Sequence, residues 1–410
     1  MTADLPLLEQ SVPLAAGPAV PADLRDGYEV LRAALRHGLD VSLYPRQVLM
    51  VATADGEEFA FVHGVPDTST LAAVTYAQDK RMRRELLQRA GLPVPAGASF
   101  AIGREVDRAK RFARSVGYPV VVKPTVGDNL SEILPAANEK ELSRAIEYLR
   151  RPEVERPTFT RTAYALTLLL EPDEEDGRSV APAKYQFMVE QRPPGDRLRI
   201  LLIDGEVSSA LRLSNDLAKP AWQDVTEDLH QSLRDLAVKA ALTVPGLTVV
   251  ALDLSVADHT RPAGAEVYIM DFSERPMLAT QAAVSEGLAQ RLGEQILLSR
   301  AAGNVLQPTP REEASVEFTI EGATNAPAAV AAICERANAS GLVGHLTVVD
   351  QVEGRAEGHI QGDPAEVALL FELLLAGQID RERAMLVRAR QVPAAAAEVH
   401  QGTFRHLDAV

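Results

Sequence analysis

Cysteine is almost absent from this chain, whose 410 residues include only Cys334. A single thiol cannot form an internal disulfide, which excludes the small disulfide-stabilised domains and fits a reducing compartment. Residues 1–6 show no basic segment leading into an apolar one, so no secretory signal is expected. No run approaches the roughly 18 apolar residues that cross a bilayer. We therefore expect a cytoplasmic protein.

Positive charge is in the minority. The 42 lysines and arginines are outnumbered by 57 aspartates and glutamates, and the formal net charge is -15. Nucleic acids and anionic membranes reward a basic surface, so neither is expected as a partner. A small anionic ligand stays compatible, because a local cluster of cations can oppose the global charge.

Hydrophobic residues make up 46% of the chain, which is typical of soluble globular proteins. At roughly 100 to 200 residues per domain, this length predicts two or three domains. Residues 1–78 mix short strand-like runs with a helical stretch and predict a small α/β domain. Residues 79–308 predict a larger α/β domain.

Residues 312–392 show the order strand, helix, strand, strand, helix, strand. This order is that of the ferredoxin-like βαββαβ folds, so the predicted fold class is α/β followed by α+β. Residues 393–410 are rich in alanine and then polar, and we expect a loosely held tail.

Lysine is rare, with seven residues against thirty-five arginines, yet Lys123 stands at the end of a strand expected at 120–122. Continuous valines predict a strand covered on both faces, and the flanking prolines keep it short. A loop at 125–131, which contains Gly127, follows directly. A lysine at a strand end is most often a surface residue, but an ammonium beside a loop that can close is also suited to phosphate.

A strand expected at 268–275 carries polar side chains on one face. The period of two along a strand places Asp271, Ser273 and Arg275 on one side and the alternate residues on the other. Asp253 lies on a strand that we expect to pair antiparallel with this one. A single acid at a strand end is more often solvated. Two carboxylates and a hydroxyl together predict an oxygen-rich site for Mg²⁺.

The order of these features resembles the ATP-grasp superfamily, and most closely the ATP-grasp region of cyanophycin synthetase-like amino-acid ligases. The resemblance extends from residue 67 to about residue 300 and implies the ATP-grasp fold for residues 79–308, with a lid at about 115–190. It is carried by Asp79-Lys80, Gly91-Leu92-Pro93-Val94-Pro95, residues 117–124, 189–191 and 224–230, Asp253, and residues 271–276.

The resemblance implies a role for each matching position. Those that would bind ATP are Lys80, Lys123 and Gly127 for the phosphates, Glu190 and Gln191 for the adenine, and Asp196 for the ribose. Those that would act on the reacting groups are Arg199 and Arg212 near the transferred phosphoryl group, Arg275 at the carboxyl substrate, and Asp253, Asp271 and Ser273 as ligands of Mg²⁺.

Enzymes of this kind activate a carboxylate as an acyl phosphate, which an amine then attacks, giving ADP, phosphate and an amide. The resemblance therefore implies a ligase that joins two small molecules, a carboxylate and an amine, with amino acids as the expected substrates. Neutralised phosphates and an ordered acceptor lower a barrier that consists mainly of charge and positioning.

Two departures from the family pattern leave other functions open. Ser273 stands where relatives have asparagine, and the loop after Lys123 keeps one glycine, Gly127, where relatives have two or more. These changes suit a catalytically impaired nucleotide-binding protein. The position of Arg275 also suits an ATP-dependent carboxylase that uses bicarbonate.

The C-terminal part resembles acylphosphatase over residues 316–362. Val330 and Val348 occupy the positions of that family's catalytic arginine and asparagine. An apolar pair does not bind phosphate. We therefore expect a non-catalytic module that serves packing, contact in a homodimer, or the shape of the ligase site.

Overall fold

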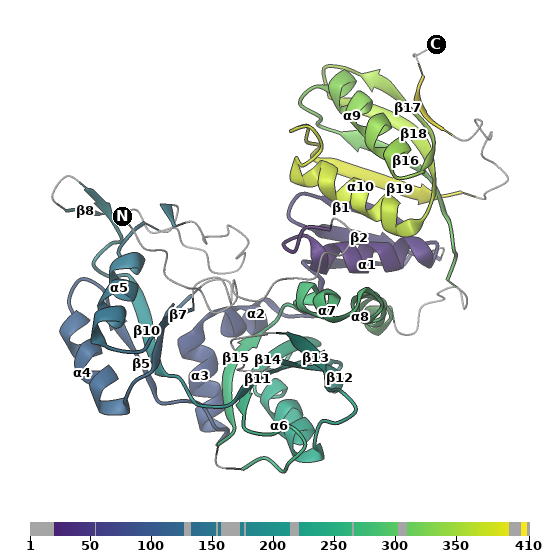
Figure 1. The fold of residues 1–410 in the computed structure, drawn as a ribbon. Helices are drawn as coiled ribbons and strands as arrows, with labels where there is room; N and C mark the ends of the chain where they lie inside the picture. The colour runs from purple at the N-terminus through teal and green to yellow at the C-terminus, as the bar shows by residue number, and fades with distance from the viewer. Residues whose placement is uncertain are drawn as a thin grey trace. The chain divides into compact units, whose positions relative to one another are not determined.

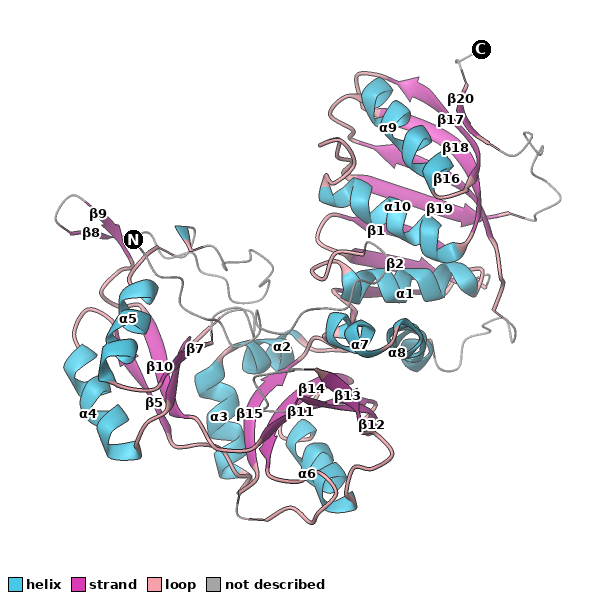
Figure 2. Ribbon diagram, in the orientation of Figure 1, coloured by secondary structure: helices cyan, strands magenta, loops and turns pink. Residues whose placement is uncertain are grey.

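The computed structural model describes residues 20–53, 55–126, 133–152, 155–156, 173–175, 178–213, 221–264, 266–301, 310–392 and 403–407. The chain forms two compact units. The first unit contains Ser69–Glu274, and the second unit contains Ala16–Thr68 together with Arg275–Val410. Both are mixed α/β structures (Figures 1 and 2), so the predicted fold class is confirmed. No helix of the described residues is long and apolar enough to cross a membrane.

One part of the first unit is a four-stranded antiparallel sheet with the strand order β5-β10-β6-β7. Its strands are β5 (Gly97–Ala101), β6 (Val120–Pro124), β7 (Leu134–Ala136) and β10 (Gln186–Gln191). Helices α4 (Val106–Val116) and α5 (Glu139–Leu149) pack against it, and a short hairpin contains β8 (Asp173–Glu175) and β9 (Arg178–Val180). Every residue of β6 is buried, as the valine run predicted.

The other part is a five-stranded antiparallel sheet with the order β13-β12-β11-β14-β15. Its strands are β11 (Asp196–Ile203), β12 (Glu206–Leu213), β13 (Trp222–Asp224), β14 (Val249–Val256) and β15 (Tyr268–Ser273). The predicted antiparallel pairing of the last two is confirmed. Leu198, Leu252 and Phe272 face the core, which α6 (Gln231–Ala241) covers. The alternate residues of these strands therefore point to the opposite face.

Two helices precede the four-stranded sheet in the chain, α2 (Leu71–Gln78) and α3 (Lys80–Arg89). Asp79 lies between them and caps α3, because its side chain accepts hydrogen bonds from the backbone N–H groups of Arg81 and Met82. Such a cap satisfies donors that have no partner within the helix. It fixes Lys80 as the first residue of α3.

The second unit is built on a nine-stranded sheet with the order β20-β17-β18-β16-β19-β1-β2-β3-β4. Its C-terminal elements are β16 (Ala314–Glu321), α9 (Ala326–Ala339), β17 (Val343–Asp350), β18 (Arg355–Gly362), α10 (Pro364–Ala376), β19 (Leu386–Gln391) and β20 (Phe404–His406). The antiparallel order β17-β18-β16-β19 is the predicted ferredoxin-like arrangement, which is confirmed.

The N-terminal residues continue this sheet, where a separate domain of residues 1–78 was predicted. Their elements are α1 (Arg25–Arg36), β1 (Asp40–Tyr44), β2 (Val48–Ala52), β3 (Glu58–Val62) and β4 (Val65–Pro66). β1 pairs with β19, Val41 lying opposite Ala389. A strand at the edge of a sheet offers unpaired N–H and C=O groups, and alternation within one strand does not reveal which distant strand fills that edge.

The end of the predicted ATP-grasp domain also belongs to the second unit. Residues from Arg275 onward form α7 (Leu278–Val284) and α8 (Glu286–Arg300), and both helices pack against α1. Gly293 makes the contact of α8 close, because a Cβ atom there would lie 2.5 Å from the Cβ of Glu29. The boundary of this unit therefore lies near residue 274, and residue 308 lies outside the described residues.

Helices α1, α9 and α10 lie along one face of the nine-stranded sheet (Figure 2). Apolar side chains such as Val41, Phe61, Val316 and Phe318 point to that face and form its core. The opposite face is polar and contains a hollow of about 730 Å³. The tail was predicted to be loosely held, but β20 within it pairs with β17 in a parallel register.

Candidate functional site

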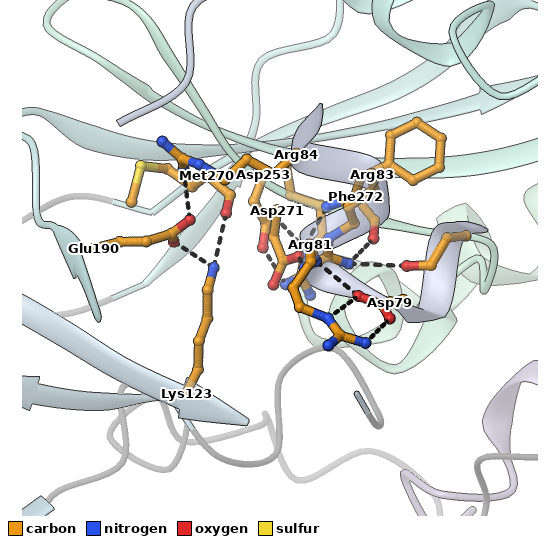
Figure 3. Close-up of polar contacts among 12 residues, drawn as sticks. Asp79, Arg81, Arg83, Arg84, Lys123, Glu190, Asp253, Met270, Asp271 and Phe272 are labelled. Carbon is orange, nitrogen blue, oxygen red and sulfur yellow. Dashed lines mark hydrogen bonds and ion pairs between the residues drawn. The ribbon is translucent and has the colours of Figure 1, made fainter. Parts of the chain in front are cut away.

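A small cavity of about 20 Å³ lies in the first unit, where α3, the four-stranded sheet and β15 meet (Figure 3). It is lined by Lys80, Arg83, Arg84, Leu87, Val94, Lys123, Glu190, Ile269, Met270, Asp271 and Phe272. The charged side chains of this lining are four cations and two carboxylates. The cavity therefore has an excess of positive charge within a chain of net charge -15.

Both lysines singled out by the sequence reach this cavity. Lys80 is 3% exposed and Lys123 is 4% exposed. The backbone N–H of Lys80 donates to the carbonyl of Thr125 at 2.8 Å, so the start of α3 is tied to the residue after β6. Two segments 43 residues apart thus contribute one lysine each to the same cavity.

Glu190 binds two of the four cations. Its Oε2 lies 2.5 Å from the Nζ of Lys123, and its Oε1 accepts a hydrogen bond of 2.8 Å from the Nη1 of Arg84. Burial alone raises the pKa of Glu190, but the charges of Lys123 and Arg84 outweigh this effect and hold the pKa below its ordinary value. Glu190 is therefore a buried anion between two cations.

Lys123 also joins the two sheets of the first unit. Its Nζ donates to the carbonyl oxygen of Met270 on β15 at 3.4 Å (Figure 3). On its own sheet, Lys123 lies opposite Met188 of β10. Gln191 ends β10 and is half-buried, and its backbone N–H donates to the carbonyl of Ala96 at 2.8 Å.

Asp253 lies between two residues on neighbouring strands, with Arg199 of β11 opposite on one side and Asp271 of β15 on the other. Arg199 is 1% exposed and donates to both oxygens of Asp253, at 2.8 and 3.0 Å. Arg197 donates to Oδ2 at 3.2 Å through its Nε. Burial alone raises the pKa of Asp253, but these two guanidinium groups hold it well below its usual range.

Trp222 covers the two arginines that bind Asp253. The guanidinium carbon of Arg199 lies 5.3 Å from the centre of the indole ring, and that of Arg197 lies 5.6 Å from it. A cation over the face of an indole is attracted by the ring quadrupole. The indole therefore helps to fix both guanidinium groups beside the carboxylate.

Asp271 is bound by Arg83 of α3, whose guanidinium also donates to the carbonyl oxygens of Phe272 and, at 3.2 Å, of Ala77. The other oxygen of Asp271, Oδ2, is buried and has no hydrogen-bond partner among the described residues. Ser273 ends the strand, is 5% exposed and lies opposite Ala251.

The residues predicted to bind Mg²⁺ therefore share one strand pair, but the carboxylates have arginine counter-ions. Within the described part of the chain, no group of three or more His, Cys, Asp or Glu side chains is arranged to hold a metal ion. The available oxygen is Oδ2 of Asp271, opposite Asp253.

Asp196 and Arg212 bind each other at the start of β11 and on β12. The Nε of Arg212 donates to Oδ2 of Asp196 at 2.6 Å, and a second nitrogen lies 2.5 Å from the same oxygen. The resemblance implied that Asp196 binds the ribose and that Arg212 lies near the phosphoryl group. In this structure the two side chains bind each other.

Arg275 opens the C-terminal segment of the second unit. It binds Asp26 of α1 with distances of 3.2 and 3.1 Å, and the other oxygen of Asp26 accepts the backbone N–H of Leu278 at 2.8 Å. The structure thus holds Arg275 in an ion pair that fastens α1 to the segment before α7. Gly127 lies outside the described residues.

Arg83, Arg84 and Arg197 were not predicted from the sequence, although the first two had a detectable signal. Residues 80, 83 and 84 are spaced i, i+3 and i+4 from a helix start that Asp79 marks, so they share one face of α3. Once Lys80 is assigned to the site, this spacing predicts that Arg83 and Arg84 also face it. Arg197 carries no comparable signal, because it depends on the register of β11 against β14.

Part of the chain matches a known sequence family. Residues 79–149 match the family described as carbamoyl-phosphate synthase L chain, ATP binding domain. This segment contains α3 and β6, and therefore both lysines and both arginines of α3 that line the cavity.

Several curated proteins are similar to this chain. D-alanine–D-alanine ligase of Gloeobacter violaceus is 24% identical over 309 residues, which cover 68% of this chain and 91% of that protein. A pyruvate carboxylase subunit from Methanothermobacter thermautotrophicus is 28% identical over 163 residues, 40% of this chain and 30% of that protein. The 2-oxoglutarate carboxylase small subunit from Hydrogenobacter thermophilus is 41% identical over 69 residues, 17% of this chain and 14% of that protein.

The chain thus spans less than a third of the two carboxylase proteins. Among solved structures, D-alanine–D-alanine ligase from Bacillus anthracis is 15% identical, with a TM-score of 0.38 over 57% of this chain and 68% of that one. The family match over residues 79–149 and the similarity to nearly the full length of a D-alanine–D-alanine ligase are what this chain shares with known proteins.

Proposed function

We propose that the chain binds ATP at the cavity of the first unit and uses it as a carboxylate–amine ligase. The products are an amide or peptide bond between two small molecules, ADP and phosphate. The observation that carries this proposal is the convergence of Lys80, Arg83, Arg84 and Lys123 on one cavity. Four cations against two carboxylates suit the negative charge of a nucleotide polyphosphate.

The residue types suit different parts of this task. Lysine carries a compact charge on a flexible stem, whereas arginine presents a planar fork of donors that matches phosphate oxygens. Phosphoryl transfer depends mainly on positioning and on neutralising charge. In this proposal Lys80 and Lys123 bind the phosphates, Glu190 and Gln191 lie beside the adenine, and Asp196 lies near the ribose.

One buried oxygen on the strand pair of β14 and β15 is suited to bind Mg²⁺. Oδ2 of Asp271 is a buried oxygen without a hydrogen-bond partner among the described residues, and Asp253 lies opposite. Mg²⁺ prefers oxygen ligands, and when bound it neutralises charge on nucleotide phosphates. We propose Asp253 and Asp271 as its ligands, with Ser273 as a third.

One relative supports a proposal for the substrates. The ligase from Gloeobacter violaceus is named for joining D-alanine to D-alanine, and its similarity extends over 91% of its length. We therefore propose amino acids as the carboxylate and the amine, in a ligase of the cyanophycin synthetase-like type. Arg199, Arg212 and Arg275 keep their proposed roles near the transferred phosphoryl group and the carboxyl substrate. Residues 312–392 act as a non-catalytic, acylphosphatase-like module that also forms the contact in a homodimer.

The test is to supply the purified chain with ATP, Mg²⁺ and a panel of amino acids, alone and in pairs. We expect release of ADP and phosphate that depends on a pair of substrates, with the condensed product identified by mass spectrometry. Lys123→Met removes the activity, whereas Lys140→Met, an exposed lysine on α5 of the same part of the unit, retains it. Absence of substrate-dependent phosphate release across the panel rules the ligase out.

A second function is favoured by one observation. Both oxygens of Asp253 are bound by arginine side chains, which compete with a metal ion for the same carboxylate. This arrangement suits a protein that binds nucleotide without turnover. Calorimetry that detects ATP binding, with no hydrolysis stimulated by any amino acid, identifies that case. Phosphate release that requires bicarbonate identifies an ATP-dependent carboxylase.

A further inference from the structure

Glu190 connects an arginine of α3 with the lysine at the end of β6. Arg84 belongs to the second turn of α3, and its guanidinium donates to Oε1 of Glu190 and to the carbonyl of Pro95. Lys123 contacts Oε2 of Glu190 and the carbonyl of Met270. Arg84 is thus anchored by neutral and charged acceptors, while a long flexible stem carries the ammonium of Lys123.

The cavity in this arrangement is too small for a nucleotide. Its volume of about 20 Å³ is close to that occupied by one water molecule. Ligand pockets have volumes of roughly 300 Å³ or more. Phosphate groups can therefore reach the lysines only if the contacts that close the cavity are exchanged for contacts with the phosphates.

Glu190 limits how this exchange can occur. It is 4% exposed, and a buried carboxylate that loses its only cation pays a large desolvation cost. Arg84 removes that cost, because it stays bound to Oε1 when Lys123 leaves Oε2. The contact of Lys123 with Met270 is a single hydrogen bond to a backbone oxygen, which phosphate oxygens can replace.

We propose that the Glu190 carboxylate binds the Lys123 ammonium until a phosphate group replaces it as the partner of Lys123. Arg84 is the positioning residue in this exchange, because it stays bound to Glu190 when Lys123 leaves. This inference rests on the nucleotide binding proposed above and deepens it. It gives Glu190 a function in the polyphosphate affinity of the site. Both side-chain oxygens of Glu190 face cations, so the contact with adenine proposed above falls to its backbone, which a substitution of the side chain leaves in place.

The experiment measures the affinity of the full chain for ATP, for inorganic tripolyphosphate and for adenosine by calorimetry. In Glu190→Gln, phosphate binds Lys123 without first breaking an ion pair. We therefore expect ATP and tripolyphosphate to bind about tenfold more tightly, while the affinity for adenosine is unchanged. In Arg84→Gln, Lys123 is the one ion-pair partner of Glu190 that is left among the described residues, so ATP and tripolyphosphate both bind about tenfold more weakly.

Two further variants separate this exchange from a general loss of structure. Arg84→Lys keeps a cation beside Glu190 and is expected to restore polyphosphate affinity to within about threefold of the wild type. The double variant Arg84→Gln/Glu190→Gln is expected to bind tripolyphosphate at least as tightly as the wild type, because the anion is gone. Glu85→Gln, at an exposed position on the same helix, is the matched control and leaves all three affinities unchanged.

Weaker binding of both ATP and adenosine by Glu190→Gln makes Glu190 an adenine-binding residue and overturns the exchange. Equal tripolyphosphate affinity in the wild type, Glu190→Gln and Arg84→Gln overturns it as well, while leaving ATP binding intact. If neither ATP nor tripolyphosphate binds to the wild type or to any variant, the proposed function fails together with this inference.

Discussion

Asp253 and Asp271 lie directly opposite each other on antiparallel strands, and arginine side chains bind both carboxylates. Two buried acids at this separation repel each other unless cations lie nearby. Arg199 comes from the strand on the far side of Asp253, and Arg83 comes from α3. Guanidinium groups from two different elements therefore hold the two carboxylates beside each other.

Substitution of Asp253 by Asn should be strongly destabilising. The change leaves the buried Arg199 without its counter-ion, and removing one partner of a buried pair costs about 3–5 kcal/mol. Denaturant unfolding of the purified variant measures this loss. Asp228→Asn changes an exposed acid in the same unit and should shift the free energy of unfolding by less than about 0.5 kcal/mol. Equal stability of the two variants would contradict the structural role of Asp253.

The same carboxylate predicts a loss of stability in acid. The pKa of Asp253 is depressed in the folded protein, so the folded state binds its proton less readily than the unfolded chain, whose aspartate pKa is about 3.9. The stabilisation is complete above that pH and is lost as the pH falls toward the folded pKa. Unfolding free energies measured between pH 6 and pH 3 should decline more steeply in the wild type than in Asp253→Asn.

Glu372 in α10 predicts the opposite dependence for the second unit. Burial raises the pKa of its carboxyl from 4.5 to about 8. The folded state retains the proton up to about pH 8, whereas the unfolded chain releases it near 4.5, so stability falls as the pH rises between these values. The full effect is on the order of 4–5 kcal/mol, at about 1.4 kcal/mol per pKa unit.

Glu372→Gln removes this dependence and should be more stable than the wild type at pH 8. Thermal unfolding at pH 5 and at pH 8 tests it. The midpoint of the second unit should fall between these values in the wild type and stay level in the variant. A wild-type midpoint that rises over the same range would show that Glu372 is ionised in the folded state.

Arg275→Met tests the position of an arginine that the sequence assigned to the substrate. The structure pairs it with Asp26, which is 3% exposed, so the substitution should destabilise the second unit by about 3 kcal/mol or more. The double variant Asp26→Asn/Arg275→Met removes both charges and should recover part of this loss. A variant with full stability that has lost only activity would instead support a direct role at the substrate.

The predictions from sequence were successful where the pattern is local. The expected pairing of β14 with β15 brought Asp253 and Asp271 to one strand pair, and the order of elements after residue 312 indicated the ferredoxin-like sheet. Valine content and flanking prolines placed β6 and hence Lys123. Each of these inferences needs only the period of a strand or the sequence of neighbouring elements.

The sequence could not show features that depend on distant partners. Asp253 is paired with arginines because β11 lies beside β14 in one register, and a shift by one residue would turn Arg197 and Arg199 to the other face. The ion-pair partner of Arg275 is Asp26 of α1, which lies 249 residues earlier in the chain. Such pairings are set by packing of whole elements.

The pairing of β1 with β19 can form only late in the synthesis of the chain. Val41 and Ala389 lie opposite each other, and residues Ser69–Glu274 of the first unit are inserted between them in the chain. At roughly 5 to 20 residues per second, a ribosome needs on the order of 17 to 70 seconds to make the intervening segment. Residues 69–274 can therefore fold while β1 still has an open edge, because β19, one of the last strands of the described residues, is made only afterwards.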